Sequence, residues 1–212
     1  MQYDKRTFFQ YYISLIKTQH ILISSFCNNN DYNSGIIKIN LFLIGFAIEY
    51  TVNALFFNDE TMHKIYESKG NFDFETQIPN AVYSTLISLI LNYPLNFLAL
   101  TNNIIIEFKH EGKKNVRNIK NLKNKLIIKF ILYFIISFLF LLFFWYYISM
   151  FGVIYNNTQY HLLKDFLMSF GLSLIFPFFI YLLPGIFRIP SLSDKNKKRK
   201  CLYNFSKILQ SF

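Results

Sequence analysis

The apolar residues of the chain fall into four long blocks, at about 36–57, 80–100, 127–149 and 162–183, with polar segments between them. Each block is close to the roughly 20 residues that an α-helix needs to cross about 30 Å of hydrocarbon. Helices are required there because backbone N–H and C=O groups find no water partners within lipid. The pattern therefore predicts an all-α, multi-pass membrane protein with four transmembrane helices.

The composition agrees with a membrane location. Of 212 residues, 53% are hydrophobic and 20% aromatic, which would be unusually apolar for a soluble domain. The formal net charge of +10 would raise the question of nucleic acid in a soluble protein. Here the basic residues flank the apolar blocks, so the partner we expect is a lipid bilayer with an anionic inner leaflet, with other membrane subunits second and no nucleic acid.

The distribution of lysine and arginine predicts the orientation, because these side chains are retained on the cytoplasmic face. Seventeen of them lie in three segments, 1–35, 101–126 and 184–212, whereas the two opposite loops carry only Lys64 and Lys69. Both termini are therefore predicted to be cytoplasmic.

This orientation divides the chain into three parts. Residues 1–35 form a juxtamembrane amphipathic segment, 36–183 a four-helix transmembrane domain with the basic cytoplasmic loop 101–126, and 184–212 a basic cytoplasmic tail. The aromatic residues that follow Phe144 end the third block on the far side, where amphipathic rings prefer the headgroup level. Asn156 begins a glycosylation sequon in the short outer loop that follows.

Basic residues alternate with apolar ones in the cytoplasmic loop and tail, which is typical of amphipathic helices that lie on the inner leaflet. The residues predicted to bind lipid headgroups are Lys113, Lys114, Arg117, Lys120, Lys123, Lys197, Lys198, Arg199 and Lys200. Two interpretations stay open: the lysines set the topology and nothing more, or they recognise lipid with a regulatory meaning.

Three of the four blocks carry small or polar residues spaced four apart, so that each set lies along one helix face. The stripes are Gly45, Glu49 and Asn53 in the first block, Ser84, Ser88, Asn92 and Asn96 in the second, and Asp165, Ser169 and Ser173 in the fourth. The third block is nearly all apolar and is expected to face lipid around most of its circumference. Because such residues permit close helix approach and interhelical hydrogen bonds, the stripes predict a bundle seam or the lining of a path.

Glu49 is the exceptional member of these stripes, because an ionised carboxylate in hydrocarbon costs about 3 kcal/mol or more unless it is paired or protonated. Lys164, near the outer end of the fourth block, is the nearest basic residue by depth, with Asp165 beside it. Three hypotheses follow: an ion pair with Lys164, a neutral acid hydrogen-bonded to Asn53 or a serine, or part of an ion or proton path.

Catalytic signatures are missing from the sequence. No phosphate-binding loop, nucleophile elbow, zinc-binding helix or dinucleotide fingerprint occurs. The four histidines stand alone, and Cys27 and Cys201 offer no metal-ligand spacing. We therefore expect no enzyme activity, no catalytic residues, no cofactor and no metal site.

Three stretches give the chain a resemblance to a known set of proteins: DKRTFFQYYISLIKTQH, NALFFNDETMHKIYESKGNFDFETQIPNAVYSTLIS and FGVIYNNTQYHLLKDFLMSFGLSLIFPFFIYLLPGIFRIPSL. They resemble the C-terminal membrane module of a large set of uncharacterised transmembrane proteins from single-celled eukaryotes. The resemblance covers nearly the whole chain and implies a topology, but no activity and no site residues. Members of that set are often longer, so the chain is either a short stand-alone member or an incomplete one.

Two functional hypotheses follow from these patterns. The first is a membrane-anchoring or assembly module for a surface or endomembrane protein. The second is a subunit of an ion channel or transporter, in which Glu49 and the stripes of the second and fourth blocks line the path.

The predicted topology can be tested with single cysteines at Asn71 and Asn118, introduced after Cys27 and Cys201 are replaced by serine. An impermeant thiol reagent applied outside intact cells should label the cysteine at Asn71, because that loop is predicted to face outward, and should spare the one at Asn118. Labelling at Asn118 without labelling at Asn71 would contradict the orientation.

Overall fold

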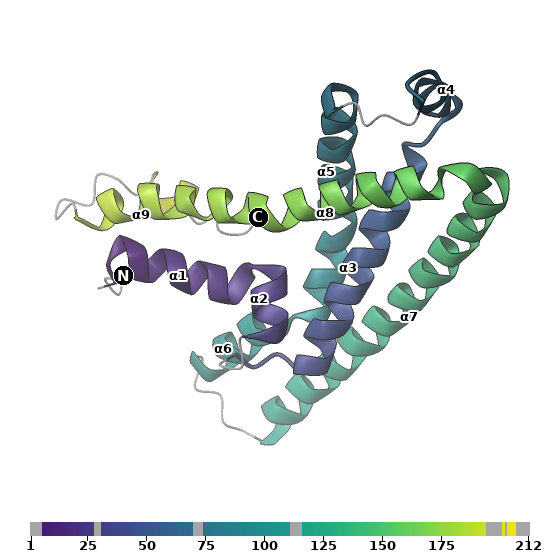
Figure 1. Ribbon diagram of the computed structural model, residues 1–212. Coiled ribbons are helices and arrows are strands. Elements are labelled where there is room, and N and C mark those ends of the chain that lie inside the picture. Colours follow the sequence, from purple (N-terminus) through teal and green to yellow (C-terminus); the bar gives the residue numbers. More distant parts are fainter. Residues whose placement is uncertain are drawn as a thin grey trace. The chain divides into compact units, whose positions relative to one another are not determined.

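The computed structural model describes residues 6–27, 31–69, 74–110, 116–193, 201 and 203–206 (Figure 1). Within these ranges every regular element is helical and none is a strand, which confirms the predicted all-α class. The elements are α1 (Phe8–Gln19), α2 (Ile21–Phe26), α3 (Gly35–Leu55), α4 (Asp59–Glu67), α5 (Phe74–Ala99), α6 (Asn102–His110), α7 (Val116–Ile154), the 3-10 turn η1 (Asn156–Thr158), α8 (Gln159–Ile180) and α9 (Leu182–Ser193).

The four predicted apolar helices are present. By length and composition, four helical stretches could cross a membrane: Gly35–Leu55, Ile78–Ala99, Arg117–Ile154 and Asn156–Arg188. Each contains most or all of one predicted block, and the two later stretches extend well beyond theirs.

Helix α7 differs most from the prediction. It runs for 39 residues without interruption, so the basic segment expected to lie on the membrane as a separate helix continues directly into the third apolar block. The sequence explains this continuity, because no proline occurs in α7 and its first glycine is Gly152. Nothing therefore ends the helix at the point where the side chains change from polar to apolar.

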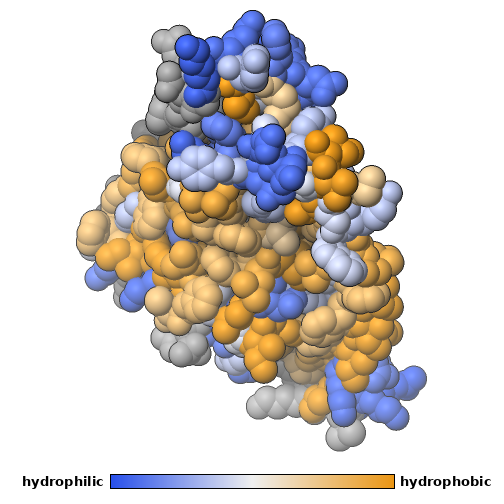
Figure 2. All heavy atoms as spheres, turned by 45° about the vertical axis from the view of Figure 1, so that its right-hand side comes forward, coloured by the Kyte–Doolittle hydropathy of each residue, from blue (hydrophilic) through white to orange (hydrophobic). Residues whose placement is uncertain are grey.

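Helix α3 is the central helix of the bundle, and α5 and α7 lie beside it (Figure 1). Half of the apolar window of α3 is buried, against 11% for that of α7. The largest core cluster consists of Ile37, Leu41, Ile44, Ile48 and Val52 of α3, Leu95 and Ala99 of α5, and Tyr133 and Phe144 of α7. The low burial of α7 confirms that the third apolar helix exposes most of its circumference. Apolar side chains fill the middle of the view in Figure 2, and hydrophilic ones gather at its top.

Aromatic rings join α3 to α8. The ring of Phe46 lies edge-on to those of Phe166, at 4.7 Å between centroids, and Phe170, at 5.1 Å. Tyr50 makes a similar contact with Phe166, at 5.1 Å. Such edge-to-face pairs add about 0.5–1.5 kcal/mol each to the packing and fix the relative rotation of the two helices.

The described helices belong to two compact units. The central unit comprises Asn30–Leu172, and the terminal unit comprises Met1–Asn29 with Ser173–Phe212. In the terminal unit, Tyr11 and Leu15 of α1 are buried together with Tyr181, which lies in the turn between α8 and α9. The Tyr12 hydroxyl donates to the Phe178 carbonyl at 3.1 Å, and His20 Nε2 lies 2.8 Å from the Leu174 carbonyl oxygen.

Helix α4 follows α3 and is held by its own polar residues. The Asn58 side chain caps it by accepting from the Thr61 N–H at 2.9 Å, and Lys64 donates to Glu60 at 2.8 Å. The Tyr155 hydroxyl, at the end of α7, donates to Asp59 at 2.8 Å, and this bond raises the pKa of Tyr155. These contacts connect α4 to the turn between α7 and α8.

The Glu60–Lys64 pair predicts a pH dependence for α4. The hydrogen bond from Lys64, and then its charge, hold the pKa of Glu60 below 4.5. Because the folded pKa is lowered, this stabilisation is present above pH 4.5 and is lost as the pH falls through the folded pKa. We expect the exchange protection of amides 63–67, corrected for intrinsic rates, to fall between about pH 5 and pH 3.

The control variant is Glu60→Gln, in which the exchange protection of amides 63–67 should depend less on pH. An unchanged dependence in Glu60→Gln would show that the pair does not stabilise α4.

Candidate functional site

A cluster of three polar side chains lies inside the central unit, and we call it the Asn53 cluster: Asn53 of α3, Ser84 of α5 and Ser169 of α8. The Asn53 amide donates to Ser169 Oγ at 2.6 Å and to the Glu49 backbone carbonyl at 2.8 Å. Its Oδ1 accepts from Ser84 Oγ at 3.2 Å. Ser84 and Ser169 are fully buried and Asn53 is 4% exposed, so one amide connects three helices with all its bonds inside the protein.

The Asn53 cluster uses one residue from each predicted stripe. These residues meet because spacings of four keep each stripe on one helix face, and because α3 lies between the other two helices. Ser84 and Ser169 also lie near carbonyls one turn earlier in their own helices, Ala81 at 3.1 Å and Phe166 at 3.1 Å. The hydroxyls therefore have a local partner in addition to the interhelical one.

The structure does not form the ion pair between Glu49 and Lys164, which was one of the three hypotheses for Glu49. Glu49 is 5% exposed, inside the bundle. Lys164 directs its amino group toward the ring of Tyr160, with Nζ 4.5 Å from the centroid. The physical reason is that a lysine near the end of an apolar helix keeps its charge close to the headgroup level and gains a cation–π contact there, rather than entering the apolar interior.

The remaining residues of the predicted stripes are not members of the Asn53 cluster. Asp165 is 6% exposed, and its Oδ1 has no hydrogen-bond partner among the described residues. On α5, Ser88 Oγ and Asn92 Oδ1 are likewise buried without a partner in the described part of the chain. Ser173 is half-buried. The seam thus contains buried oxygen atoms beyond those that the Asn53 cluster uses.

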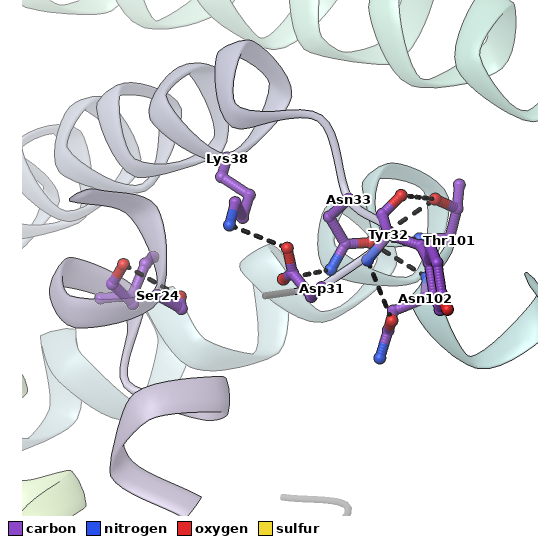
Figure 3. Close-up of polar contacts among 8 residues, drawn as sticks. Ser24, Asp31, Tyr32, Asn33, Lys38, Thr101 and Asn102 are labelled. Carbon is purple, nitrogen blue, oxygen red and sulfur yellow. Dashed lines mark hydrogen bonds and ion pairs between the residues drawn. The ribbon is translucent and has the colours of Figure 1, made fainter. Parts of the chain in front are cut away.

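A second polar cluster joins the segment before α3 to the segment after α5, and we call it the loop joint: Asp31, Tyr32, Asn33, Lys38, Thr101 and Asn102 (Figure 3). Asn33 Oδ1 accepts from the backbone N–H groups of Thr101, at 2.8 Å, and Asn102, at 3.0 Å. It therefore caps the start of α6 from a distant part of the sequence. Asn102 in turn accepts from the Tyr32 N–H at 3.2 Å.

Two buried lysines lie at this end of the apolar helices. Lys38 is 3% exposed and its Nζ lies 3.1 Å from Asp31 Oδ1. Lys129 is 8% exposed and donates to the Leu100 carbonyl at 2.7 Å, where α5 has just ended. An ammonium group at a helix C-terminus satisfies an open carbonyl and interacts favourably with the helix dipole.

The sequence patterns did not single out either lysine or the loop joint. The available signal was a lysine within the first turn of the first and third predicted spans, Lys38 and Lys129, because a charge inside an apolar block requires a partner. The partners themselves were not predictable, since Asp31 and Leu100 gain their roles only when the helices pack.

The predicted headgroup-binding and glycosylation residues lie at the surface where they are described. Arg117, Lys120 and Lys123 are exposed on α7, and Asn156 is exposed in η1. Six predicted headgroup residues lie outside the described residues: Lys113, Lys114, Lys197, Lys198, Arg199 and Lys200.

The described part of the chain brings together no group of three His, Cys, Asp or Glu side chains that could hold a metal ion. Comparisons with protein-family models, with curated proteins and with solved structures found no match. The Asn53 cluster, the buried carboxyl groups and the loop joint are therefore the features on which a function can be based.

Two serines one turn apart on α5 provide a test of the Asn53 cluster. Ser84→Ala removes a hydrogen bond to Asn53 and should cost about 0.6 kcal/mol of stability, while Asn53→Leu, which removes both interhelical bonds at similar volume, should cost about 1–4 kcal/mol. Ser88→Ala is the matched control, because Ser88 is equally buried but its Oγ has no hydrogen-bond partner among the described residues, and it should cost less stability than Ser84→Ala. Unfolding in detergent followed by circular dichroism measures all three, and an equal effect at Ser84 and Ser88 would contradict the cluster's role.

Proposed function

We propose that the chain is an integral membrane protein with a non-catalytic role, a membrane-anchoring or assembly module whose two termini lie in the cytoplasm. Four apolar helices long enough to span a bilayer support the membrane location. The concentration of lysine and arginine in three of the five polar segments supports the orientation.

The Asn53 cluster is the observation that carries this proposal. It joins α3, α5 and α8 through one buried amide, and the aromatic contacts of Phe46 add to the same interface. A seam whose central polar groups bond to one another is what a stable bundle requires in lipid, where polar groups find no other partners. Such a bundle can hold an attached region at the membrane without moving a solute.

The basic segments that we assign to the cytoplasm add electrostatic attraction to the membrane surface. Arg117, Lys120 and Lys123 are exposed on the polar first turns of α7, where an anionic leaflet would attract them by about 1 kcal/mol each. The glycosylation site at Asn156 belongs to this proposal, because it requires η1 to face away from the cytoplasm.

The second candidate is a subunit of an ion channel or transporter. Two buried carboxyl groups, those of Glu49 and Asp165, favour it, because ionisable groups inside apolar helices mark ion and proton paths in many membrane proteins. The buried oxygens of Ser88 and Asn92 on α5 would extend such a path.

One experiment with two readouts decides between these candidates. The full chain carrying a fluorescent protein after Phe212 is expressed in cells and also reconstituted into vesicles. An anchoring module should keep the reporter on membranes after alkaline carbonate extraction, because its helices span the bilayer, and should leave the vesicles as ion-tight as protein-free ones.

The channel candidate requires the opposite result in vesicles. It predicts cation or proton flux above the protein-free level, reduced at least tenfold by Glu49→Gln and unchanged by Glu60→Gln, which removes an exposed carboxylate from α4. Flux that meets these conditions would replace the anchoring proposal, and release of the reporter by carbonate would overturn both.

A further inference from the structure

Asp165 of α8 is a buried carboxyl group that has no partner among the described residues. Its side chain is 6% exposed, and Oδ1 accepts no hydrogen bond from the described part of the chain. The adjacent cation, Lys164, is directed at the ring of Tyr160, with Nζ 4.5 Å from the ring centroid. On the same face of α8, Leu162 and Phe166 are each 1% exposed. The carboxyl group therefore lies between apolar side chains.

An open pocket lies one helical turn from Asp165. It has a volume of about 440 Å³ and lies between the end of α4 and the start of α8, where it is lined by Ile65, Tyr66, Glu67, Lys69 and His161. His161 is half-buried and precedes Asp165 by four residues, so both side chains lie on one face of α8. Side chains in a helix lean toward its N-terminus, so the Asp165 side chain leans toward the turn that carries His161.

On the other side of Asp165, the polar hydrogens of the Asn53 cluster are already used. The Asn53 amide donates to Ser169 and to a carbonyl of its own helix. The Ser84 hydroxyl donates to Asn53 Oδ1 at 3.2 Å. The Ser169 hydroxyl, one turn from Asp165, lies 3.1 Å from the Phe166 carbonyl and donates to it. The cluster therefore has no donor left with which to stabilise a carboxylate at Asp165.

The titratable groups on the surrounding elements offer no positive partner either. Besides His161 and Lys164 of α8, they are Glu49 and Tyr50 of α3, Tyr83 of α5, Tyr147 and Tyr155 of α7, and Glu67 and Lys69 at the pocket. Tyr155 donates to Asp59, and Tyr147 donates to the Ala54 carbonyl. Glu49 is a second buried carboxyl group, and two ionised carboxylates in one apolar interior would repel each other.

We propose that Asp165 is a proton-binding site, whose carboxyl group is protonated at neutral pH and exchanges its proton with water in the pocket through His161. An ionised carboxylate buried without a partner is strongly unfavourable, so a carboxyl group in such a position takes up a proton. A metal cation would need several oxygen ligands, whereas a proton needs one oxygen atom. Asp165 is the one carboxyl group that the described residues place beside this pocket inside an apolar helix.

The exchange requires no group beyond those already named. Neutral imidazole has one N–H and one acceptor nitrogen, so His161 can take a proton from pocket water on one nitrogen and release one from the other. Side chains four residues apart on a helix have Cβ atoms about 5–6 Å apart, which leaves room for direct contact or for one bridging water. The net change converts the Asp165 carboxylate and one proton from water into a carboxylic acid.

The test records the infrared spectrum of the purified full chain in detergent at neutral pH. A carboxylic acid has a C=O band that a carboxylate lacks, and exposed Asp and Glu side chains are ionised at this pH. The difference between the wild-type and Asp165→Asn spectra should contain one acid band. Glu60→Gln, which removes an exposed carboxylate from α4, is the matched control and should leave the acid band unchanged. An acid band that Asp165→Asn also leaves unchanged would overturn the proposal.

Isotopic labelling of the wild-type chain keeps the test decisive if Asp165→Asn does not fold. Aspartate labelled with heavy carbon in its carboxyl group should shift the acid band to lower frequency. The other two described aspartates do not compete for this band, since Asp31 is paired with Lys38 and Asp59 accepts from Tyr155. An acid band that keeps its frequency would show that no aspartate is protonated and would overturn the proposal.

Exchange into heavy water tests the route through the pocket. The acid band moves to lower frequency as deuterium replaces the proton. His161→Phe keeps a ring but removes both nitrogens, so it should slow this shift at least tenfold. His110→Phe, which removes an exposed histidine from α6, is the matched control and should change the rate less than twofold. Equal rates in the wild type and in His161→Phe would overturn the role of His161.

These outcomes are separate from those of the proposed function. Protonation and exchange in detergent depend neither on the orientation of the helices nor on ion flux. A carboxyl group that binds a proton from the pocket does not have to pass it across the membrane, so the site is compatible with an anchoring module. A reversed topology or a measured flux would therefore change the proposed function and leave the Asp165 site standing.

Discussion

A polar group inside hydrocarbon must find its partners on neighbouring helices, because neither lipid tails nor water can supply them. Asn53 meets this constraint completely, with its amide bonded to Ser169 and to its own helix and its oxygen bonded to Ser84. The geometry of one amide then fixes the rotation of α3 relative to two neighbours. With that rotation set, Phe46 and Tyr50 are directed at α8, and the large core cluster forms with α5 and α7.

The same constraint acts at the other end of the central unit. Lys38 and Lys129 are buried in the first turns of apolar stretches, and each amino group is bonded to an oxygen from another part of the chain. Their partners belong to the segment before α3 and to the end of α5, the same two segments that Asn33 connects by capping α6. The loop joint is thus built from groups that would be costly to leave unpaired.

The number, type and approximate position of the apolar helices could be predicted from the sequence, because lipid imposes a length and a composition that a linear pattern reveals. The site could be predicted only in part. Spacing placed Asn53, Ser84 and Ser169 on helix faces, but the contacts among them depend on which helices are neighbours. Depth alone suggested Lys164 as the partner of Glu49, whereas the direction of its side chain is set by Tyr160. The close approach of Phe8 to Gly185, where α1 packs against α9, is likewise encoded by no local pattern.

The unbroken length of α7 has a mechanical consequence. A helix of 39 residues measures about 58 Å, nearly twice the roughly 30 Å of a hydrocarbon core. Tyr133 and Phe144 in the core and the bond of Lys129 to Leu100 fix the apolar part of this helix. Only residues 116–128, about 20 Å of helix, extend beyond these contacts, so a bend of about 10° near Lys129 would move the basic end at Val116 by about 3 Å.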